Sequence, residues 1–424
     1  MNGLLTDLYE LTMAAGYFAA GRPAGPAVFE LSVRRLPKNR DYILIAGLEQ
    51  ALEYLLHLRF TAEEVDYLRA LPQFARVSPA FFDYLREFRF TGDVHAVPEG
   101  TILYAGEPVL TIRAPLIQAQ IPETYLLSTL TFQTLIATKA ARVTQAAAGR
   151  GVVEFGTRRA HTPQAGVLGA RAAYIGGCIG TSNTQAGFRF GIPVMGTCAH
   201  SWVMSYPTER EAFRRLQELL GPYTIQLVDT YEPVEGVRRA AALGPPLWGI
   251  RLDSGDFDSL SRQARAILDQ AGLGGAKIMA SGDLDEYRIA ALVAAGAPID
   301  SFGVGTELAT SGDAPSMGAI YKLVEVEGRP VAKWSEDKAS LPGAKQLFRL
   351  PDRDILALAS ESCPPGAEAL LQPVIVYGQR TAPPPPLTEI RGRAARSLGG
   401  VQPRPMLLSD PLKALAECLR EERK

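Results

Sequence analysis

The chain has 424 residues, of which 47% are hydrophobic and 21% are charged. This length predicts at least two domains, and the composition excludes a disordered chain. The 44 Lys and Arg residues balance the 45 Asp and Glu residues, which gives a formal net charge of -1. We therefore expect no general attraction to nucleic acid or to an anionic membrane, so any phosphate binding must be local.

The first residues give no sign of export. The segment Met1–Phe18 carries Asp7 and Glu10 where a secretory signal peptide would have a basic start and an uninterrupted apolar stretch. No run of about 18 apolar residues occurs, so we expect no membrane span. The sequence predicts a cytoplasmic protein with no membrane partner.

The four cysteines lie far apart in the sequence, and none forms a CxxC pair. This spacing fits neither a disulfide framework nor a zinc site. We expect reduced, buried thiols.

The first part of the chain, 1–122, is predicted to form an α/β domain. Alternating apolar and polar residues predict a strand over Ala27–Val33, and Gly47–Leu58 has the pattern of an amphipathic helix. Turn sequences rich in Gly and Pro then separate three short strands, which predicts a small antiparallel sheet: Asp93–Val97, Thr101–Tyr104 and Val109–Ile112.

The middle part, 123–325, is predicted to form an irregular β/α barrel. A segment without Gly or Pro, Glu123–Ala148, predicts a long helix at its start. Seven apolar runs follow, separated mostly by helical patterns such as Phe257–Ala271 and Glu286–Ala295, and they predict strands at Val152–Phe155, Gly177–Ile179, Pro193–Met195, Thr224–Val228, Leu247–Leu252, Lys277–Ala280 and Ser301–Val304. Short buried strands that alternate with helices indicate parallel β/α units, and six or seven of them favour a barrel over an open sheet.

The last part, 326–424, has an irregular pattern. The prolines Pro383–Pro386 predict an extended, non-helical segment, and Pro411–Lys424 predicts a short charged helix.

The loops that follow the predicted barrel strands share an unusual composition. They are rich in Gly, Thr, Ser, Asp and Arg, and they comprise Glu154–Arg159, Gly180–Asn183, Gly196–His200, Asp229-Thr230, Arg251–Asp256, Ser281–Asp283 and Gly303–Thr306. Loops at the C-terminal ends of barrel strands surround an open mouth, where ligands bind. Each motif alone could be a tight turn or a solvated charge pair. Seven polar strand ends together favour a ligand site, because packing would need apolar residues there.

The residue types in these loops point to a phosphate ligand. Glycine lets backbone N–H groups approach a phosphate closely, and Thr and Ser add hydroxyl donors. Arg158-Arg159 and Arg251 could bind phosphate or carboxylate through two N–H groups. Asp253 and Asp256 repel phosphate, so we expect them to order a ribose, a divalent cation or an arginine. A sugar phosphate with Mg²⁺ fits this set.

Among the four histidines, His200 is the candidate for chemistry, because it follows a predicted strand and a Gly-Thr turn. A neutral imidazole at a barrel mouth can act as a base, a hydrogen-bond donor or a nucleophile toward phosphate. His161 follows the arginine loop and could support it. His57 and His95 lie within a helix pattern and a strand pattern, where we expect structural roles.

The segment Thr6–Met13, Pro342–Gln346 and most of the strand-end motifs resemble nicotinate phosphoribosyltransferase, a type II phosphoribosyltransferase family of NAD salvage. The resemblance runs from Thr6 to at least Arg349. It implies an irregular β/α barrel, an N-terminal α/β domain, and a C-terminal extension that packs back on that domain. It also implies a cytoplasmic homodimer with shared active sites, and no nucleic-acid partner.

The family joins nicotinate to 5-phosphoribosyl 1-diphosphate (PRPP), which gives nicotinate mononucleotide and diphosphate. The resemblance implies that ATP hydrolysis is coupled to this reaction through a transient phosphohistidine at His200, with Mg²⁺ beside the diphosphate. It implies catalytic roles for His200, Arg251, Asp253 and Asp256. It implies substrate binding by Tyr9, Arg158, Arg159, Thr181, Ser182, Asn183, Ser254, Gly255, Ser281, Gly282, Asp283, Gly303, Gly305 and Thr306.

Within these groups we expect distinct contacts. Tyr9 would stack on the pyridine ring, and Arg158 and Arg251 would bind the carboxylate and the diphosphate. Asp253 and Asp256, with Mg²⁺, would hold ribose and diphosphate. Backbone and hydroxyl donors would bind the 5′-phosphate, from Gly282, Gly303, Gly305 and Thr306.

One position of the Gly180–Asn183 motif distinguishes this family from its closest relative. Nicotinamide phosphoribosyltransferase resembles this family but has an aspartate where this chain has Ser182. An uncharged hydroxyl suits the anionic carboxylate of nicotinate, whereas an aspartate would cost about 1 kcal/mol or more by repulsion. Quinolinate phosphoribosyltransferase fits less well, since a second ring carboxylate calls for more basic residues.

Two other classes of function fit the sequence less well. A Schiff-base aldolase needs a lysine at the C-terminal end of a barrel strand, but Lys277 lies at a strand start and Lys139 in the leading helix. A non-catalytic phosphate-binding protein would have no use for His200 and the paired aspartates. The assay that discriminates among these classes is product formation from nicotinate and PRPP, with and without ATP.

Overall fold

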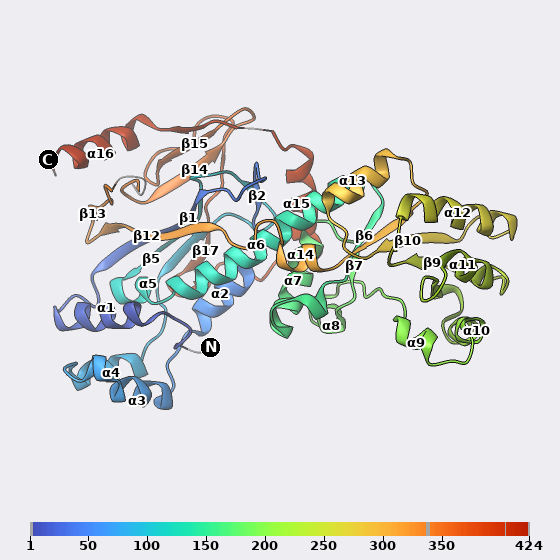
Figure 1. Ribbon diagram of the computed structural model, residues 1–424. Coiled ribbons are helices and arrows are strands. Elements are labelled where there is room, and N and C mark those ends of the chain that lie inside the picture. Colours follow the sequence, from blue (N-terminus) through green and yellow to red (C-terminus); the bar gives the residue numbers. More distant parts are fainter. Residues whose placement is uncertain (1–2, 336–339, 403, 423–424) are drawn as a thin grey trace. The chain divides into compact units, whose positions relative to one another are not determined.

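The computed structural model describes residues 3–335, 340–402 and 404–422. Two compact units make up the chain, one formed by 1–135 and 316–424 and the other by 136–315. Each unit is built around its own sheet system (Figure 1). The predicted middle segment was 123–325, and both unit boundaries lie inside it. Helix α6 (Glu123–Ala146) runs across the first boundary, and β12 (Gly318–Val326) pairs with the first unit's sheet.

The first unit contains a large sheet of antiparallel strand pairs, as the sequence predicted for its N-terminal part. Its described strands lie in the order β13 (Arg329–Pro330), β12, β1 (Pro26–Arg35), β5 (Pro108–Pro115), β3 (Asp93–Ala96), β17 (Gln372–Val376) and β18 (Gln379–Arg380). A separate two-stranded sheet pairs β2 (Ile43–Leu44) with β4 (Ile102–Leu103). Strands from both ends of the chain therefore share one sheet.

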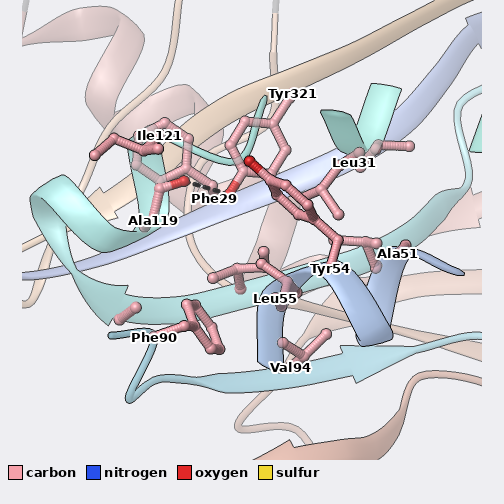
Figure 2. Close-up of a cluster of buried hydrophobic side chains, with 14 of the residues drawn as sticks. Phe29, Leu31, Ala51, Tyr54, Leu55, Phe90, Val94, Ala119, Ile121 and Tyr321 are labelled. Atoms are coloured by element: carbon pink, nitrogen blue, oxygen red, sulfur yellow. Dashed lines mark hydrogen bonds between the residues drawn. The ribbon is translucent and has the colours of Figure 1, made fainter. Parts of the chain in front are cut away.

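Helices complete the first unit. Helix α2 (Leu48–His57) buries Leu48, Ala51, Leu52 and Leu55, the spacing of one helical face. Ala51, Tyr54 and Leu55 of α2 belong to one buried cluster with Phe29 and Leu31 of β1 (Figure 2). In the same cluster, the Tyr321 hydroxyl donates to the Ala119 carbonyl at 2.6 Å. The other helices are α1 (Leu8–Ala19), α3 (Ala62–Ala70), α4 (Pro79–Arg86), α5 (Leu116–Gln120), α15 (Leu387–Gly399) and α16 (Asp410–Glu421), with the 3₁₀ turn η1 (Pro72–Phe74).

The C-terminal part is more regular than its sequence indicated. A second sheet has the order β16 (Glu368–Ala369), β14 (Lys345–Arg349), β15 (Asp354–Leu358) and β19 (Met406–Leu408). The prediction of an irregular region was wrong here, because these strands are short and gain stability from long-range pairing rather than local pattern. The extended segment at Pro383–Pro386 is confirmed, and so is the terminal helix as far as Glu421; Arg423 and Lys424 lie outside the described residues.

The second unit is a parallel α/β structure, which confirms the predicted fold class. Its sheet has the order β7 (Gly180–Thr181), β6 (Gly151–Glu154), β11 (Ser301–Val304), β10 (Lys277–Ser281), β9 (Gly249–Leu252) and β8 (Ile225–Leu227). The first and last long strands, β6 and β11, pair with each other, which is the strand order of a barrel. A parallel bridge from Thr181 to Val194 extends the ladder beyond β7. Among the described residues, no ladder joins that bridge to β8, so the barrel is irregular.

Helices connect the strands of this unit. They are η2 (Thr157–Arg159), α7 (Pro163–Ile175), α8 (Thr184–Phe190), α9 (His200–Met204), α10 (Glu209–Leu220), η3 (Gly221–Tyr223), α11 (Pro233–Ala241), α12 (Phe257–Gln270), α13 (Glu286–Ala294) and α14 (Thr306–Thr310). The strand predicted at Gly177–Ile179 was wrong in position. Gly177, at φ +111°, belongs to the turn after α7, and the strand begins at Gly180.

Two further expectations concern single features. All four cysteines are free of disulfides, but Cys363 and Cys418 are exposed, so the prediction of buried thiols holds for Cys178 and not for those two. These two cysteines lie in a loop and in a helix, at positions where the sequence has no apolar pattern that would predict burial. Among the described residues, no helix is long and apolar enough to cross a membrane.

Candidate functional site

The second unit brings most of the predicted site residues to one edge of its sheet. The strands are parallel, so their C-terminal ends meet at the same edge. Strand β9 contributes Arg251, and the loop after it contributes Asp253. Strand β10 ends at Ser281, and α9 begins at His200. These four side chains form a connected group, which we call the strand-end cluster.

Asp253 is the centre of this cluster. Its Oδ1 lies 3.2 Å from the Arg251 Nη2 and also accepts a short hydrogen bond from the Ser281 hydroxyl. Burial raises the pKa of the Asp253 carboxyl, but the neighbouring Arg251 and the Ser281 hydroxyl outweigh it, and the net pKa lies below its usual value. Asp253 is therefore an ionised carboxylate at neutral pH.

His200 lies on the other side of the same carboxylate. Its Nε2 is 3.7 Å from Asp253 Oδ2, and its Nδ1 lies 3.1 Å from the Thr230 hydroxyl. The side chain is 41% exposed. The imidazole is thus fixed at Nδ1 and accessible from the solvent side.

Arg251 is fixed by the segment before α9. Its Nη1 donates to the Thr197 hydroxyl in a short hydrogen bond and to the Cys198 carbonyl at 3.3 Å. The side chain is 11% exposed, and its buried Nε has no hydrogen-bond partner among the described residues. An unsatisfied donor on a buried guanidinium is costly unless a ligand accepts from it.

Asp229 is a residue of this site that the sequence analysis quoted but did not assign. Its Oδ2 accepts from the Asp253 backbone N–H at 2.9 Å and from the Ser254 hydroxyl at 2.7 Å. Its Oδ1 is buried and has no partner among the described residues. The signal was an acidic residue at the end of a barrel strand, next to the Thr230 that binds His200.

Glu154 was also missed, although it ends β6. Its carboxylate accepts from the Thr181 hydroxyl at 2.5 Å and from the Gly156 N–H. Burial raises the pKa of Glu154, and these two donors only partly offset that. The Thr181 hydroxyl in turn accepts from the Asn183 N–H at 2.9 Å. Glu154 therefore fixes the loop that presents the exposed Ser182.

Two predicted site residues cap helices. Asn183 Oδ1 accepts from the Ala186 N–H at 2.8 Å at the start of α8, and Asp256 Oδ1 accepts from the N–H groups of Asp258 and Ser259 at the start of α12. Capping accounts for these residue types without a ligand. Their roles in substrate binding stay predictions.

Two glycines, one directly after β10 and one within β11, are required by close packing. A Cβ on Gly282, at φ +97°, would lie 2.0 Å from the Asp253 carbonyl oxygen. A Cβ on Gly303 would lie 2.4 Å from the Phe155 ring. No larger residue fits these two positions, so the loops depend on glycine for their course, and their predicted phosphate binding is untested. Of the other predicted binding residues, Gly255 lies in the loop after β9, Asp283 follows Gly282, Gly305 follows β11 and Thr306 begins α14.

Arg158, Arg159 and Tyr9 are predicted binding residues that do not belong to the strand-end cluster. Arg158 and Arg159 are exposed in η2 after β6, on the same sheet edge. Tyr9 lies in α1 of the first unit and is 47% exposed; burial of part of the ring and nearby acidic side chains raise its pKa. Its predicted stacking on a pyridine ring is untested.

No group of three or more His, Cys, Asp or Glu residues within the described ranges could hold a metal ion. A cation held wholly by protein ligands is therefore not supported there. The unpartnered Asp229 Oδ1 offers one carboxylate oxygen, which suits an ion that takes most of its ligands from phosphate and water.

Comparison with known proteins agrees with this architecture. The family described as nicotinate phosphoribosyltransferase (NAPRTase) N-terminal domain matches residues 4–131, and the nicotinate phosphoribosyltransferase (NAPRTase) family matches residues 151–346. The nicotinate phosphoribosyltransferase pncB2 of Mycobacterium tuberculosis is 45% identical over 90% of this chain and 83% of its own length. The nicotinate phosphoribosyltransferase of Bacillus subtilis is 44% identical over 82% of this chain and 73% of its own.

Solved structures give the same result. The human nicotinic acid phosphoribosyltransferase has a TM-score of 0.87 and 30% identity, and the match covers 98% of this chain and 100% of that one. The nicotinate-nucleotide pyrophosphorylase of Pyrococcus furiosus has a TM-score of 0.77 at 28% identity, over 94% and 95% of the two chains. From these matches over both units, the chain belongs to the nicotinate phosphoribosyltransferase family and is an enzyme of that class.

Proposed function

We propose that the strand-end cluster transfers the phosphoribosyl group of PRPP to nicotinate. The lone pair of the pyridine nitrogen attacks the anomeric carbon, the bond from that carbon to the diphosphate oxygen breaks, and diphosphate leaves with the bonding electrons. The ring nitrogen is already a nucleophile, so the enzyme must position it and neutralise the leaving group. The observation that carries this proposal is the contact of Arg251, Asp253 and His200 at one sheet edge.

Arg251 compensates the negative charge of the diphosphate or of the nicotinate carboxylate. Its buried, unpartnered Nε supports this role, because a bound anion would accept from it. Asp253, ionised and held by Arg251 and Ser281, accepts hydrogen bonds from the ribose hydroxyls. The glycine loops after β10 and β11 bind the 5′-phosphate. Arg158, Arg159, Ser182 and Tyr9 contribute to the nicotinate site.

Mg²⁺ belongs to this proposal as an ion carried by the substrate phosphates. The free oxygen of Asp229 and the carboxylate of Asp253 are the residues that would hold it, and an ion with one or two carboxylates and several phosphate and water ligands is typical of Mg²⁺. When bound, the ion offsets charge on the departing diphosphate.

ATP is proposed as a co-substrate that phosphorylates His200. With Nδ1–H donating to the Thr230 hydroxyl, Nε2 carries the lone pair. Nε2 attacks the γ-phosphorus of ATP, the bond to the β-phosphate oxygen breaks, and ADP leaves. Water later takes the phosphoryl group and gives inorganic phosphate. A homodimer with shared sites and a cytoplasmic location complete the proposal.

The direct test is nicotinate mononucleotide formation from nicotinate and PRPP by the full-length chain. We expect product without ATP at a slow rate and faster synthesis with ATP and Mg²⁺. Product from nicotinamide at a higher kcat/KM than from nicotinate would favour the alternative, nicotinamide phosphoribosyltransferase. Absence of product from either base would contradict the proposed reaction. It would favour the other alternative, a different barrel enzyme that acts on a sugar phosphate.

A labelling experiment tests the histidine. Incubation with γ-labelled ATP should give acid-labile, base-stable protein label, because a phosphoramidate has that stability. The label should be absent in His200→Ala and present in His161→Ala, since His161 is exposed outside the cluster. His200→Ala should also lose ATP hydrolysis while it keeps slow synthesis. Label that persists in His200→Ala would move the phosphorylated atom to another residue.

A further inference from the structure

A cavity of about 370 Å³ in the first unit has an unusual lining. Four arginines border it: Arg349 at the end of β14, Arg393 and Arg396 on α15, and Arg404 before β19. Glu368 is the one acidic residue among the described lining residues. The volume lies within the range of about 300 to 1,000 Å³ that is usual for small-molecule sites.

Three of these guanidinium groups are held in place by hydrogen bonds to other residues. Arg349 binds the fully buried Asp354 through Nε at 3.0 Å and Nη2 at 2.8 Å, and its Nη1 donates to the carbonyl of the lining residue Ile102 at 2.9 Å, which leaves two N–H donors. Arg393 Nη1 donates to the Glu99 carbonyl at 2.7 Å, and Arg404 Nη1 donates to the Leu350 carbonyl at 2.6 Å. A guanidinium has five N–H donors, so each group keeps donors for a ligand while its orientation is fixed. Little side-chain entropy would be lost on binding.

The positive charge is only partly compensated. Asp354 serves both Arg349 and Arg404, whose Nη1 is 4.0 Å from it, and Arg393 pairs with Glu389 at 3.0 Å. Arg396 is exposed and makes no ion pair with any residue that the structure describes. Burial and the adjacent Asp354 raise the pKa of Glu107, the other carboxyl near Arg349, so it contributes little negative charge at neutral pH.

Hydroxyl groups complete the lining. Thr101 and Ser397 border the cavity, and Tyr104 lies with its ring centre 6.0 Å from the Arg349 Cζ. Guanidinium and hydroxyl donors around a cavity match the oxygen atoms of a phosphate chain, because arginine binds phosphate through two parallel N–H groups. A single phosphate would engage only part of four arginines in this volume.

We infer that this cavity binds an anion that carries a di- or triphosphate group. All lining residues belong to the first unit, and none belongs to the strand-end cluster. The inference therefore does not depend on the proposed transfer reaction. The chemistry recognised is the phosphate chain, and it can come from free inorganic polyphosphate or from a nucleoside di- or triphosphate.

The test is calorimetric titration of the full-length protein with inorganic triphosphate at fixed ionic strength. It is done in an Arg251→Ala background, which weakens competing anion binding at the strand-end cluster. Arg396→Glu should lower the affinity at least about tenfold, because a repelling carboxylate then faces the phosphate chain. This variant should fold, since the Arg396 side chain is exposed and unpaired among the described residues. The matched control is Arg420→Glu on α16, the same charge change on an exposed residue outside the lining.

Loss of affinity in Arg396→Glu but less than about twofold loss in Arg420→Glu supports the site. Equal losses in both variants would show a general charge effect and overturn it, as would an unchanged isotherm in Arg396→Glu or no binding in the Arg251→Ala background. A parallel titration with ATP distinguishes the sources. An ATP affinity that exceeds that of triphosphate and falls in Arg396→Glu assigns the cavity to a nucleotide, and equal affinities that both fall assign it to the phosphate chain alone. Failure of phosphoribosyl transfer would leave these outcomes unchanged.

Discussion

Two charged clusters of the second unit show how similar residues serve different purposes. The strand-end cluster pairs Arg251 with Asp253, and buried atoms without partners remain on Arg251 Nε and on the neighbouring Asp229 Oδ1. The other cluster surrounds Lys139 of α6, which is 1% exposed and lies 2.6 Å from Glu286 Oε2 and 2.9 Å from Asp313 Oδ1. Arg142 Nε binds the second oxygen of Glu286 at 2.9 Å.

The two clusters differ in the exposure of their side chains and in how closely each charged group is paired with an opposite charge. A cationic nitrogen lies within 2.9 Å of each Glu286 carboxylate oxygen, from Lys139 at Oε2 and from Arg142 at Oε1, although Oε2 accepts no hydrogen bond of good geometry among the described residues. With Asp313, these ion pairs tie α6, α13 and the turn after α14 together. The strand-end cluster is open to solvent at His200 and retains unused hydrogen-bonding capacity. Buried charges with close counter-charges indicate a structural link, whereas an accessible histidine and a charged group at a sheet edge, with free donors and acceptors beside them, indicate a binding site. The same burial also argues against Lys139 as a Schiff-base amine.

The largest effect should come from removing the buried cation. Lys139→Met leaves Glu286 and Asp313 without their shared partner, so we expect a loss of about 3 to 5 kcal/mol in the free energy of unfolding of the second unit. Denaturant unfolding followed by tryptophan fluorescence measures it, since Trp202 and Trp248 lie in that unit. The control is Lys277→Met, which removes an exposed pair with Asp300 and should cost less than about 1 kcal/mol. Equal losses in the two variants would contradict a special role for burial.

Arg251→Ala should act on catalysis more than on stability. Truncation leaves substrate charge without its partner in a confined site, so we expect kcat/KM for PRPP and nicotinate to fall on the order of 100-fold or more. Steady-state kinetics on both substrates measures this change. Activity retained within about threefold would show that Arg251 is structural, like Lys139.

Ser182→Asp tests the nicotinate end of the site. Ser182 is exposed between two residues that Glu154 and the start of α8 hold in place, so a longer acidic side chain fits without disturbing the loop. Repulsion of about 1 kcal/mol should raise KM for nicotinate about fivefold, and use of nicotinamide should improve. Unchanged nicotinate kinetics would mean that Ser182 does not contact the carboxylate.

The smallest effect is a difference in acid sensitivity. Burial raises the pKa of Glu286, but hydrogen bonds from Lys139 and Arg142 outweigh it, so the net pKa is lowered from 4.5. The unfolded chain then takes up the proton first as pH falls, and stability declines from near pH 4.5 downward until the folded carboxyl is also protonated. For Asp253 the corresponding decline begins near pH 3.8.

Unfolding free energies measured from pH 6 to pH 3 separate the two clusters. Glu286→Gln should reduce the loss of unfolding free energy that begins near pH 4.5. Asp253→Asn should reduce only the further loss that begins near pH 3.8. Slopes identical to that of the unmodified chain in both variants would contradict the lowered pKa values.

Several features followed directly from local pattern. The strand β1, the apolar face of α2, the long α6 and the helix–strand alternation of the second unit were predicted within a few residues, although β1 is buried on both faces from Ala27 to Val33 and not on one face as its alternation indicated. The sheet of the C-terminal part was not, because its strands are as short as Glu368–Ala369 and are stabilised by partners elsewhere in the chain. Helix α15 was not predicted either. The strand after α7 was misplaced since a turn glycine precedes it.

The sequence by itself determined which residues stand at strand ends, and therefore which chemistry is available there. Only the tertiary structure decided which of them meet. Parallel pairing of β8, β9 and β10 brings Asp229, Arg251 and Ser281 to one edge around Asp253, whereas Asn183 and Asp256 became helix caps. It also buried Lys139 and gathered Arg349, Arg393 and Arg404 around one cavity. Local pattern reports backbone preference, but contacts between distant segments depend on how whole elements pack, and no window of neighbouring residues contains that information.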